Sequence, residues 1–198
     1  MSNTSATGGY LVPNATPVVL QDASLRTLLH GVIAGITGLG TTMVRQSWNP
    51  TPAPVPAIEI DWAAFTVVSQ LADFDSYYQE ADDGSSSTQR RHESIDVLCT
   101  FYGPNCQKNA GLLIDGMRIS QNRAALYAVG MGSFGFSAVT HSPELFNDRF
   151  VDRCDVTMSL RREVVREYPI LSFLAAEGMI ETETVSQPWV VDPQGVVP

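Results

Sequence analysis

In the segment 93-ESIDVLCTFY-102, apolar residues recur at every second position from Ile95 to Phe101. The apolar positions of this alternation are Ile95, Val97, Cys99 and Phe101. A period of two is typical of a β-strand that buries one face and exposes the other. We therefore expect a strand over residues 93–102, with these side chains in the core.

A second alternating segment runs from Phe150 to Leu160. Its predicted inward row consists of Phe150, Cys154, Val156, Met158 and Leu160. Asp152 interrupts this row near the start of the predicted strand. We expect the strand to extend toward Glu167, with a β-bulge near Arg161 and Arg162.

The segments around these two strands predict further strands and turns. Ile58 to Val68 is expected to be a strand with Ile58, Ile60 and Trp62 on one face. Residues 73–80 are expected to continue the sheet or to start a hairpin, and the polar segment 81–91 is expected to be the tip of that hairpin. Further along the chain, we expect a strand over 134–139 and a turn or a single helical turn over 143–147.

Helices are predicted where apolar residues recur at steps of three and four. The first begins with Asp22 as N-cap and ends at Gly38 and Gly40. The second is capped by Asn105 and ends near Arg118. A short third helix begins at Ser120 and ends at Gly130. The predicted inward residues are Leu25, Leu28, Leu29, Val32, Ile33 and Ile36, then Ala110, Leu113, Ile114 and Met117, then Leu126 and Val129.

This order of elements favours an α+β fold with a mixed, mostly antiparallel sheet and helices packed on one face. We expect an extended N-terminal arm over 1–20, an α+β core over 21–184 and an extended C-terminal arm over 185–198. Within the core, 47–57 is a proline-rich connector, and 170–184 holds a further strand or a short helix plus a strand.

The charge excludes two classes of function. The chain carries 12 basic and 21 acidic residues, a formal net charge of -9. A nucleic-acid reader would show a basic stripe, and a membrane anchor of the polybasic kind would show clustered lysine and arginine. Acidity fits a protein that DNA slides past without binding, although many soluble proteins are equally acidic. The start of the chain lacks the pattern of a secretory signal, and its 3 cysteines fit a reducing compartment.

No catalytic, cofactor or metal site is predicted from local motifs. Residues 130–135 spell G-x-G-x-x-G, but they follow a helix and precede a strand, the reverse of the dinucleotide-binding order. His30, His92 and His141 have no second histidine or cysteine at metal-ligand spacing. The acidic residues of 73–83 lack the ligand order of a calcium loop. We therefore expect structural histidines and no enzyme.

Several segments, in this order, resemble the neck terminator proteins of long-tailed phages and related prophages. The most specific are 99-CTFYGPN-105 and 143-PELFNDRF-150. They are accompanied by 89-QRRHE-93, 119-ISQNR-123, 153-RCDVTMSLRR-162 and 168-YP-169. The resemblance covers residues 22 to 175.

The resemblance implies a structural subunit of the phage neck in the virion, made in the host cytoplasm. Such subunits form a hexameric ring that terminates the tail tube and joins it to the head connector. The implied partners are other copies of the chain, the adjacent head-completion or connector ring and the tail tube protein, with the sheath as a further candidate. Genomic DNA would pass through the lumen without sequence-specific binding. No cofactor, membrane or catalytic residue is implied.

Charged residues near the predicted hairpin tip and on the last long strand are candidates for contacts between subunits or with the lumen. They are Asp82, Asp83, Arg90, Arg91, Arg161, Arg162 and Arg166. Glu163 and Glu167 are close enough in sequence to Arg161, Arg162 and Arg166 to pair with them locally. Two alternatives stay open: another virion structural protein, such as a head completion or minor tail protein, and a small hydrolase or metal-dependent enzyme whose site the motifs do not reveal.

Overall fold

The computed structural model describes residues 10–14, 19–82, 85–146, 148–170, 176–181 and 186–191. The chain divides into two compact units. The core unit consists of Val19–Asp75 and Arg91–Val164, and the hairpin unit of Met1–Val18, Ser76–Arg90 and Val165–Pro198.

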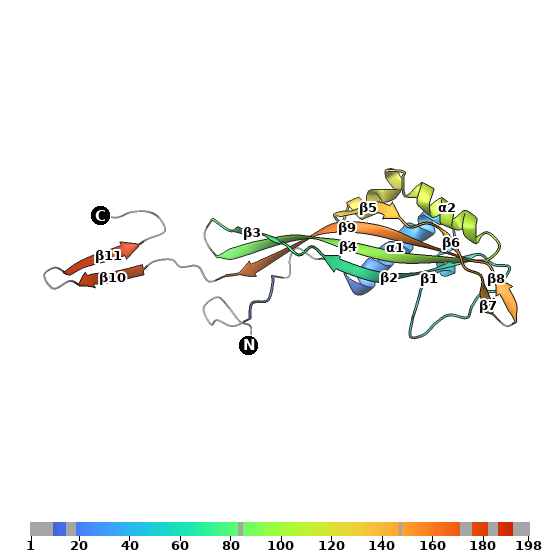
Figure 1. Ribbon diagram of the computed structural model, residues 1–198, viewed down its shortest axis with the longest axis horizontal. Helices are drawn as coiled ribbons and strands as arrows, with labels where there is room; N and C mark the ends of the chain where they lie inside the picture. Colours follow the sequence, from blue (N-terminus) through green and yellow to red (C-terminus); the bar gives the residue numbers. More distant parts are fainter. Residues whose placement is uncertain are drawn as a thin grey trace. The chain divides into compact units, whose positions relative to one another are not determined.

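The central sheet has the strand order β1-β2-β4-β9-β5 (Figure 1). β1 runs parallel to β2, whereas β2 with β4 and β5 with β9 are antiparallel. The strands are β1 Val44–Gln46, β2 Trp62–Ala72, β4 Ser86–Tyr102, β9 Arg153–Pro169 and β5 Met131–Phe136, with β6 Thr140–His141 pairing to β9 at the edge. The predicted α+β fold with a mixed, mostly antiparallel sheet is confirmed.

The alternation predicted for residues 93–102 is confirmed in β4. Ile95, Val97, Cys99 and Phe101 are 0% exposed. Phe65 of β2 is the register partner of Cys99, and Ala63 that of Phe101, so neighbouring inward rows meet on one face. Burial raises the pKa of the Cys99 thiol to about 12, which keeps this side chain neutral in the core.

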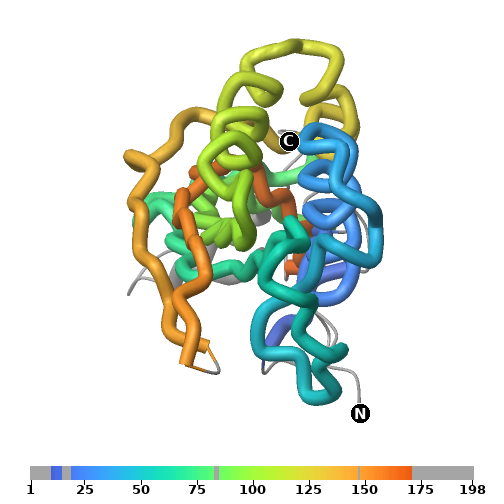
Figure 2. The backbone as a smooth tube through the Cα atoms, turned by 90° about the vertical axis from the view of Figure 1, so that its right-hand side faces the viewer, coloured from blue at the N-terminus to red at the C-terminus, as the bar shows by residue number. Residues whose placement is uncertain are grey.

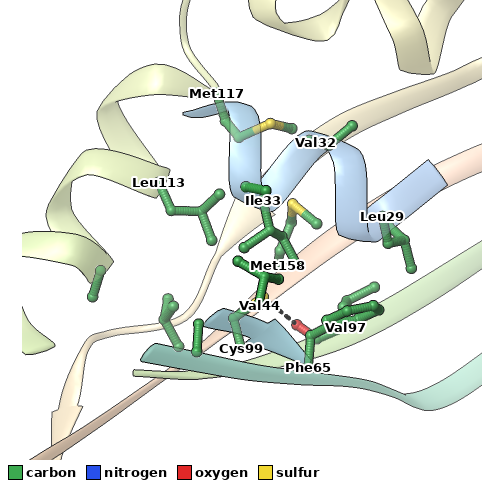
Figure 3. Packing of buried hydrophobic residues seen from close by; sticks show 14 of the residues in the cluster. Leu29, Val32, Ile33, Val44, Phe65, Val97, Cys99, Leu113, Met117 and Met158 are labelled. Atoms are coloured by element: carbon green, nitrogen blue, oxygen red, sulfur yellow. Dashed lines mark hydrogen bonds between the residues drawn. The ribbon is translucent and has the colours of Figure 1, made fainter. Parts of the chain in front are cut away.

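Two helices, α1 Asp22–Thr37 and α2 Cys106–Gly116, cover that face and lie side by side (Figure 2). Their inward side chains meet those of the sheet in one cluster (Figure 3). Leu29 and Ile33 of α1 and Leu113 of α2 are each 0% exposed. Burying a side chain of this size contributes about 1.5–3 kcal/mol, so this cluster supplies much of the driving force for folding.

The predicted ends of the helices are close to the observed ones. Gly38 has φ 72° and its N–H donates to Ala34 O at 3.0 Å, a left-handed C-cap that favours glycine. The N-cap of α1 is Gln21, one residue before the predicted Asp22, and its N–H donates to Ser24 Oγ at 3.2 Å. Asn105 occupies the N-cap position of α2, as expected.

The turn before α2 requires glycine. Gly103 has φ 100°, and a Cβ there would lie 2.8 Å from Ile60 O. The Asn105 side chain donates to Asp61 Oδ2 at 2.8 Å instead of capping the helix. The FYGPN segment therefore fastens the start of α2 to the loop before β2.

Three predicted boundaries are wrong because a local turn changes the chain direction. Residues 57–60 form a turn in which Ile60 N–H donates to Ala57 O at 2.9 Å, so β2 begins at Trp62 and not at Ile58. The predicted turn at 143–147 contains β7 Glu144–Phe146, paired antiparallel with β8 Arg149–Val151. Phe150 consequently belongs to β8, where it is 75% exposed, and it does not share the inward row of β9.

Other sequence expectations are partly confirmed. The short helical segment consists of η2 Gln121–Arg123 and α3 Ala124–Tyr127; its Leu126 is buried, but Val129 is 40% exposed. β5 begins at Met131, three residues before the predicted start. Register irregularities lie between Val67 and Ser69 of β2 and between Ser133 and Gly135 of β5, and Arg161 and Arg162 pair with Gly132 and Met131 of β5 in regular register.

The hairpin unit contains β3 Tyr77–Glu80, which pairs with the first part of β4. Ala81 N–H donates to Ser86 O at 2.9 Å, so the tip is shorter than the predicted 81–91 and residues 86–91 are strand. Asn14 of the N-terminal arm donates its N–H to Glu167 O at 2.8 Å. β10 Ala176–Glu181 bears out the further strand expected in 170–184, and it pairs with β11 Ser186–Val191.

Candidate functional site

The face of the sheet opposite the helices, here called the open face, carries a row of aromatic and cationic side chains. Trp62 of β2 stacks on Tyr102 of β4, with ring centroids 4.2 Å apart and an interplanar angle of 7°. The guanidinium of Arg45 lies 5.6 Å from the Trp62 ring centroid, and that of Arg153 lies 5.9 Å from the Tyr102 centroid. This cation–aromatic ladder crosses β1, β2, β4 and β9 in their order in the sheet.

The two arginines at the ends of the ladder each hold a segment outside the sheet. Arg45 donates from Nη1 to Pro54 O at 2.6 Å, which fixes the proline-rich connector. Arg153 donates to Glu144 Oε2 at 3.1 Å and pairs with Asp155 Oδ2 at 3.0 Å. Because Glu144 begins β7, this contact ties the β7–β8 hairpin to the sheet.

The charge state of Arg153 is set by these neighbours. Burial alone opposes its charge, but the hydrogen bond and the charge of Asp155, with a contribution from Glu144, raise the pKa of Arg153 above its ordinary value. Burial likewise raises the pKa of Tyr102, against the opposing effect of Arg153. Arg153 therefore stays charged and the Tyr102 ring stays neutral at physiological pH.

A groove of about 690 Å³ lies on the open face between the connector and the sheet. Its floor includes Trp62, Ala64 and Thr66 of β2. A smaller cavity of about 180 Å³ adjoins the connector and the hairpin and is lined by Val55, Ile58, Phe146 and Val151. Both contain mainly apolar and aromatic surface, with no arrangement of a nucleophile beside a general base among the lining residues.

Farther along the open face the contacts are polar. Asp96 of β4 accepts hydrogen bonds from Ser69 of β2 at 2.8 Å and from Ser159 of β9 at 2.7 Å. At these positions, β2, β4 and β9 therefore present polar side chains to the open face.

The β7–β8 hairpin exposes large apolar side chains. Leu145 is 61% exposed, Phe146 40% and Phe150 75%. In the core unit, Leu71 and Phe74 after the bulge of β2 are also exposed, at 70% and 100%. Single exposed apolar residues are common, but several on one short hairpin mark a surface suited to protein contact.

Arg161 and Arg162, which were grouped from sequence, have different environments. Arg161 pairs with Asp73 at 2.7 Å on the surface. Arg162 is 4% exposed, and its Nε donates to Glu93 Oε2 at 3.2 Å. Arg162 also donates to Leu20 O, and Gln70 donates to Glu93, which itself is 1% exposed. The expected local partners Glu163 and Glu167 are not the ones observed for these two arginines.

The other predicted contact residues lie in or near the β3–β4 hairpin and on β9. Arg91 Nη1 lies 3.7 Å from Glu93 Oε2. Arg90 and Asp82 are exposed, Arg166 is half-buried in β9, and Asp83 falls outside the described residues. Their assignment to subunit or lumen contacts stays a prediction.

The histidines have the following surroundings. His30 Nε2 lies 2.9 Å from Thr41 O, as expected for a structural histidine, and His92 is exposed. His141 Nε2 lies 3.5 Å from Asp152 Oδ1. The fold also brings His141 next to Cys106 and Cys154, a grouping that spacing along the sequence did not reveal because the partners come from three separate elements.

The comparison with known families identifies the chain. The family model described as phage neck terminator protein matches residues 23–184. The chain belongs to this phage neck terminator protein family. No curated protein matches it. As a neck terminator family member it is a structural component of a bacteriophage virion. Among the described residues, no helix is both long and apolar enough to cross a membrane.

Proposed function

We propose that this neck terminator family member forms a ring, hexameric as the resemblance implies, at the head-to-tail junction. The ring terminates the tail tube and joins it to the head connector, and genomic DNA passes through its lumen. The observation that carries this proposal is the family match over residues 23–184. The open face and the exposed hairpin add physical support.

The exposed hairpin suits a contact between copies. A closed ring uses heterologous contacts, in which one surface of a subunit binds a different surface of the next. The β7–β8 hairpin supplies one such surface in Phe150 and Leu145. The groove beside the connector supplies a second, hollow and largely apolar surface, which adjoins the hairpin at Glu144.

The charge of the chain supports passage of DNA without binding. A net charge of -9 per subunit repels the phosphate backbone, and it is multiplied by the number of copies in a ring. The partners of the ring are the adjacent head-completion or connector ring and the tail tube protein, with the sheath as a further candidate. No catalytic step is part of this function.

Ring formation is tested by mass photometry and negative-stain imaging of the purified full-length chain, alone and with its connector and tube proteins. We expect discrete closed rings, and Phe150→Ser should reduce the ring fraction. Ile119→Ser is the matched control, because Ile119 is 56% exposed but lies outside the hairpin. Monomers under every condition would contradict the proposal, as would equal ring fractions in the two variants.

A further inference from the structure

We propose that Cys106, His141 and Cys154 bind a zinc ion, which ties the base of the β7–β8 hairpin to the start of α2. The ligand atoms of these residues all lie within 4.8 Å of one another. The proposal rests on the geometry of the core unit and does not depend on ring formation.

Each ligand comes from a regular element. Cys106 is the first residue of α2, and Cys154 lies at the start of β9. His141 of β6 is the register partner of Cys154, so their side chains share one face of the sheet. Rigid elements hold potential ligands in place before a metal arrives, which reduces the ordering cost of binding.

The distances fit a tetrahedral site after a small adjustment. Zinc binds thiolate at about 2.3 Å and imidazole at about 2.1 Å, which places tetrahedral ligand atoms about 3.5–3.8 Å apart. The two Sγ atoms are 2.8 Å apart, so they must separate by about 1 Å to admit the ion. Zinc binding would displace both thiol protons to solvent.

A carboxylate beside His141 could orient its ring, and one side of the cluster is open to solvent. Asp152 lies 3.5 Å from His141 Nε2, the arrangement in which a carboxylate orients one imidazole nitrogen and the metal takes the other. Asp152 is itself fixed, since its carbonyl accepts a hydrogen bond from Gly103 N–H at 3.0 Å. Cys106 and Cys154 are buried, whereas the His141 side chain is 57% exposed and opens the site to solvent. A water molecule from this exposed side would take the fourth coordination position.

The site lies where it can position the hairpin. His141 and Cys154 bracket the segment that contains β7 and β8, with its exposed Leu145 and Phe150. A metal held by both residues closes the base of this loop, and Cys106 links the base to α2. The ion would therefore reinforce the base of the hairpin, which the pairing of His141 with Cys154 already closes.

Metal binding is measured on the reduced, metal-free, tag-free full-length chain. Titration with Co²⁺ should give thiolate-to-cobalt charge-transfer absorption and the d–d bands of tetrahedral cobalt, and Zn²⁺ should abolish both by displacement. Elemental analysis after dialysis should find one zinc per chain. Zinc should also raise the Tm of the chain.

Substitutions identify the ligands. Cys106→Ser and Cys154→Ser should remove the charge-transfer band, and His141→Ala should weaken zinc affinity about a hundredfold. Asp152→Asn should weaken it about tenfold, as for other second-shell carboxylates. Cys99→Ala and His92→Ala are matched controls, because neither residue belongs to the cluster, and both variants should bind zinc as the parent chain does.

Three results would overturn the proposal. The first is the absence of stoichiometric zinc or cobalt in the reduced parent chain. The second is equal zinc affinity in His141→Ala and His92→Ala; this pair decides the matter even if the cysteine variants fail to fold, since both histidines are exposed. The third is a Cys106–Cys154 disulfide in the freshly purified chain, found by mass spectrometry, that persists while zinc is offered under mild reduction.

Discussion

The two faces of the central sheet are built from the same strands but differ in character. On the helix-covered face, Val97, Cys99 and Phe101 are 0% exposed and meet α1 and α2. On the open face, Leu98 and Tyr102 of the same strand are only half-buried, beside a groove of about 690 Å³. The first face accounts for folding, and the second leaves surface for contacts with other proteins.

The largest effect is expected from truncation on the helix-covered face. Phe101→Ala removes a fully buried ring and leaves a cavity, and it should lower the free energy of unfolding by about 4 kcal/mol. Urea denaturation followed by circular dichroism measures this change. Leu98→Ala, on the open face of the same strand, is the matched control and should cost clearly less. Equal decreases in the free energy of unfolding would mean that the helix-covered face does not contribute more to stability than the open face.

The buried ion pair should give the next largest effect. Arg162→Leu leaves Glu93, which is 1% exposed, without its main cationic partner, and should lower the free energy of unfolding by about 3 kcal/mol. Arg161→Leu, one residue earlier and exposed, should cost less than about 1 kcal/mol. If the two substitutions lowered the free energy of unfolding equally, the contacts of Arg162 with Glu93 of β4 and with Leu20 would not stabilise the fold more than the surface pair does.

Local patterns in the sequence predict buried rows of a strand, but they do not predict partners that are distant along the chain. The alternation of 93–102 predicts the buried row of β4 because burial of one face imposes a period of two along the strand. The different environments of Arg161 and Arg162 were not predicted, since Glu93 lies 69 residues from Arg162 and pairs with it only through the sheet. Phe150 is misplaced by the sequence pattern because Asp152 separates β8 from β9 and belongs to neither strand, so the alternation does not continue across it.

On the open face, the cation–aromatic ladder should contribute moderately. Trp62→Leu removes the stacking with Tyr102 and the Arg45 contact, and should lower the free energy of unfolding by about 1–2 kcal/mol. A double-mutant cycle with Tyr102→Leu, measured by urea denaturation, should give a coupling of about 1 kcal/mol. Additive losses would show that the two rings do not stabilise one another.

The smallest effect concerns the surface pair of Arg161 and Asp73, 2.7 Å apart. A double-mutant cycle with Arg161→Ala and Asp73→Ala should give a coupling below about 1 kcal/mol. Raising the ionic strength should reduce it further, because exposed charges are screened by salt. A large coupling that does not change with salt would contradict this expectation, because it would show that Arg161 and Asp73 interact as strongly as a buried pair.

The candidate site was less predictable than the fold. The ladder joins residues from four strands, and the Cys106, His141 and Cys154 grouping spans α2, β6 and β9. Neither has a signature in local spacing, because strand register and the position of α2 create the contacts. The family resemblance, in contrast, was visible in the FYGPN and PELFNDRF segments, and the family match over residues 23–184 confirms it.

Electron cryomicroscopy of the phage particle that carries this chain would show whether its copies form the ring that ends the tail tube at the neck. We predict a ring of copies between the connector and the tail tube, with the β7–β8 hairpin at a contact between protein subunits and DNA in the lumen. A resolved neck in which no density fits this chain would contradict the account.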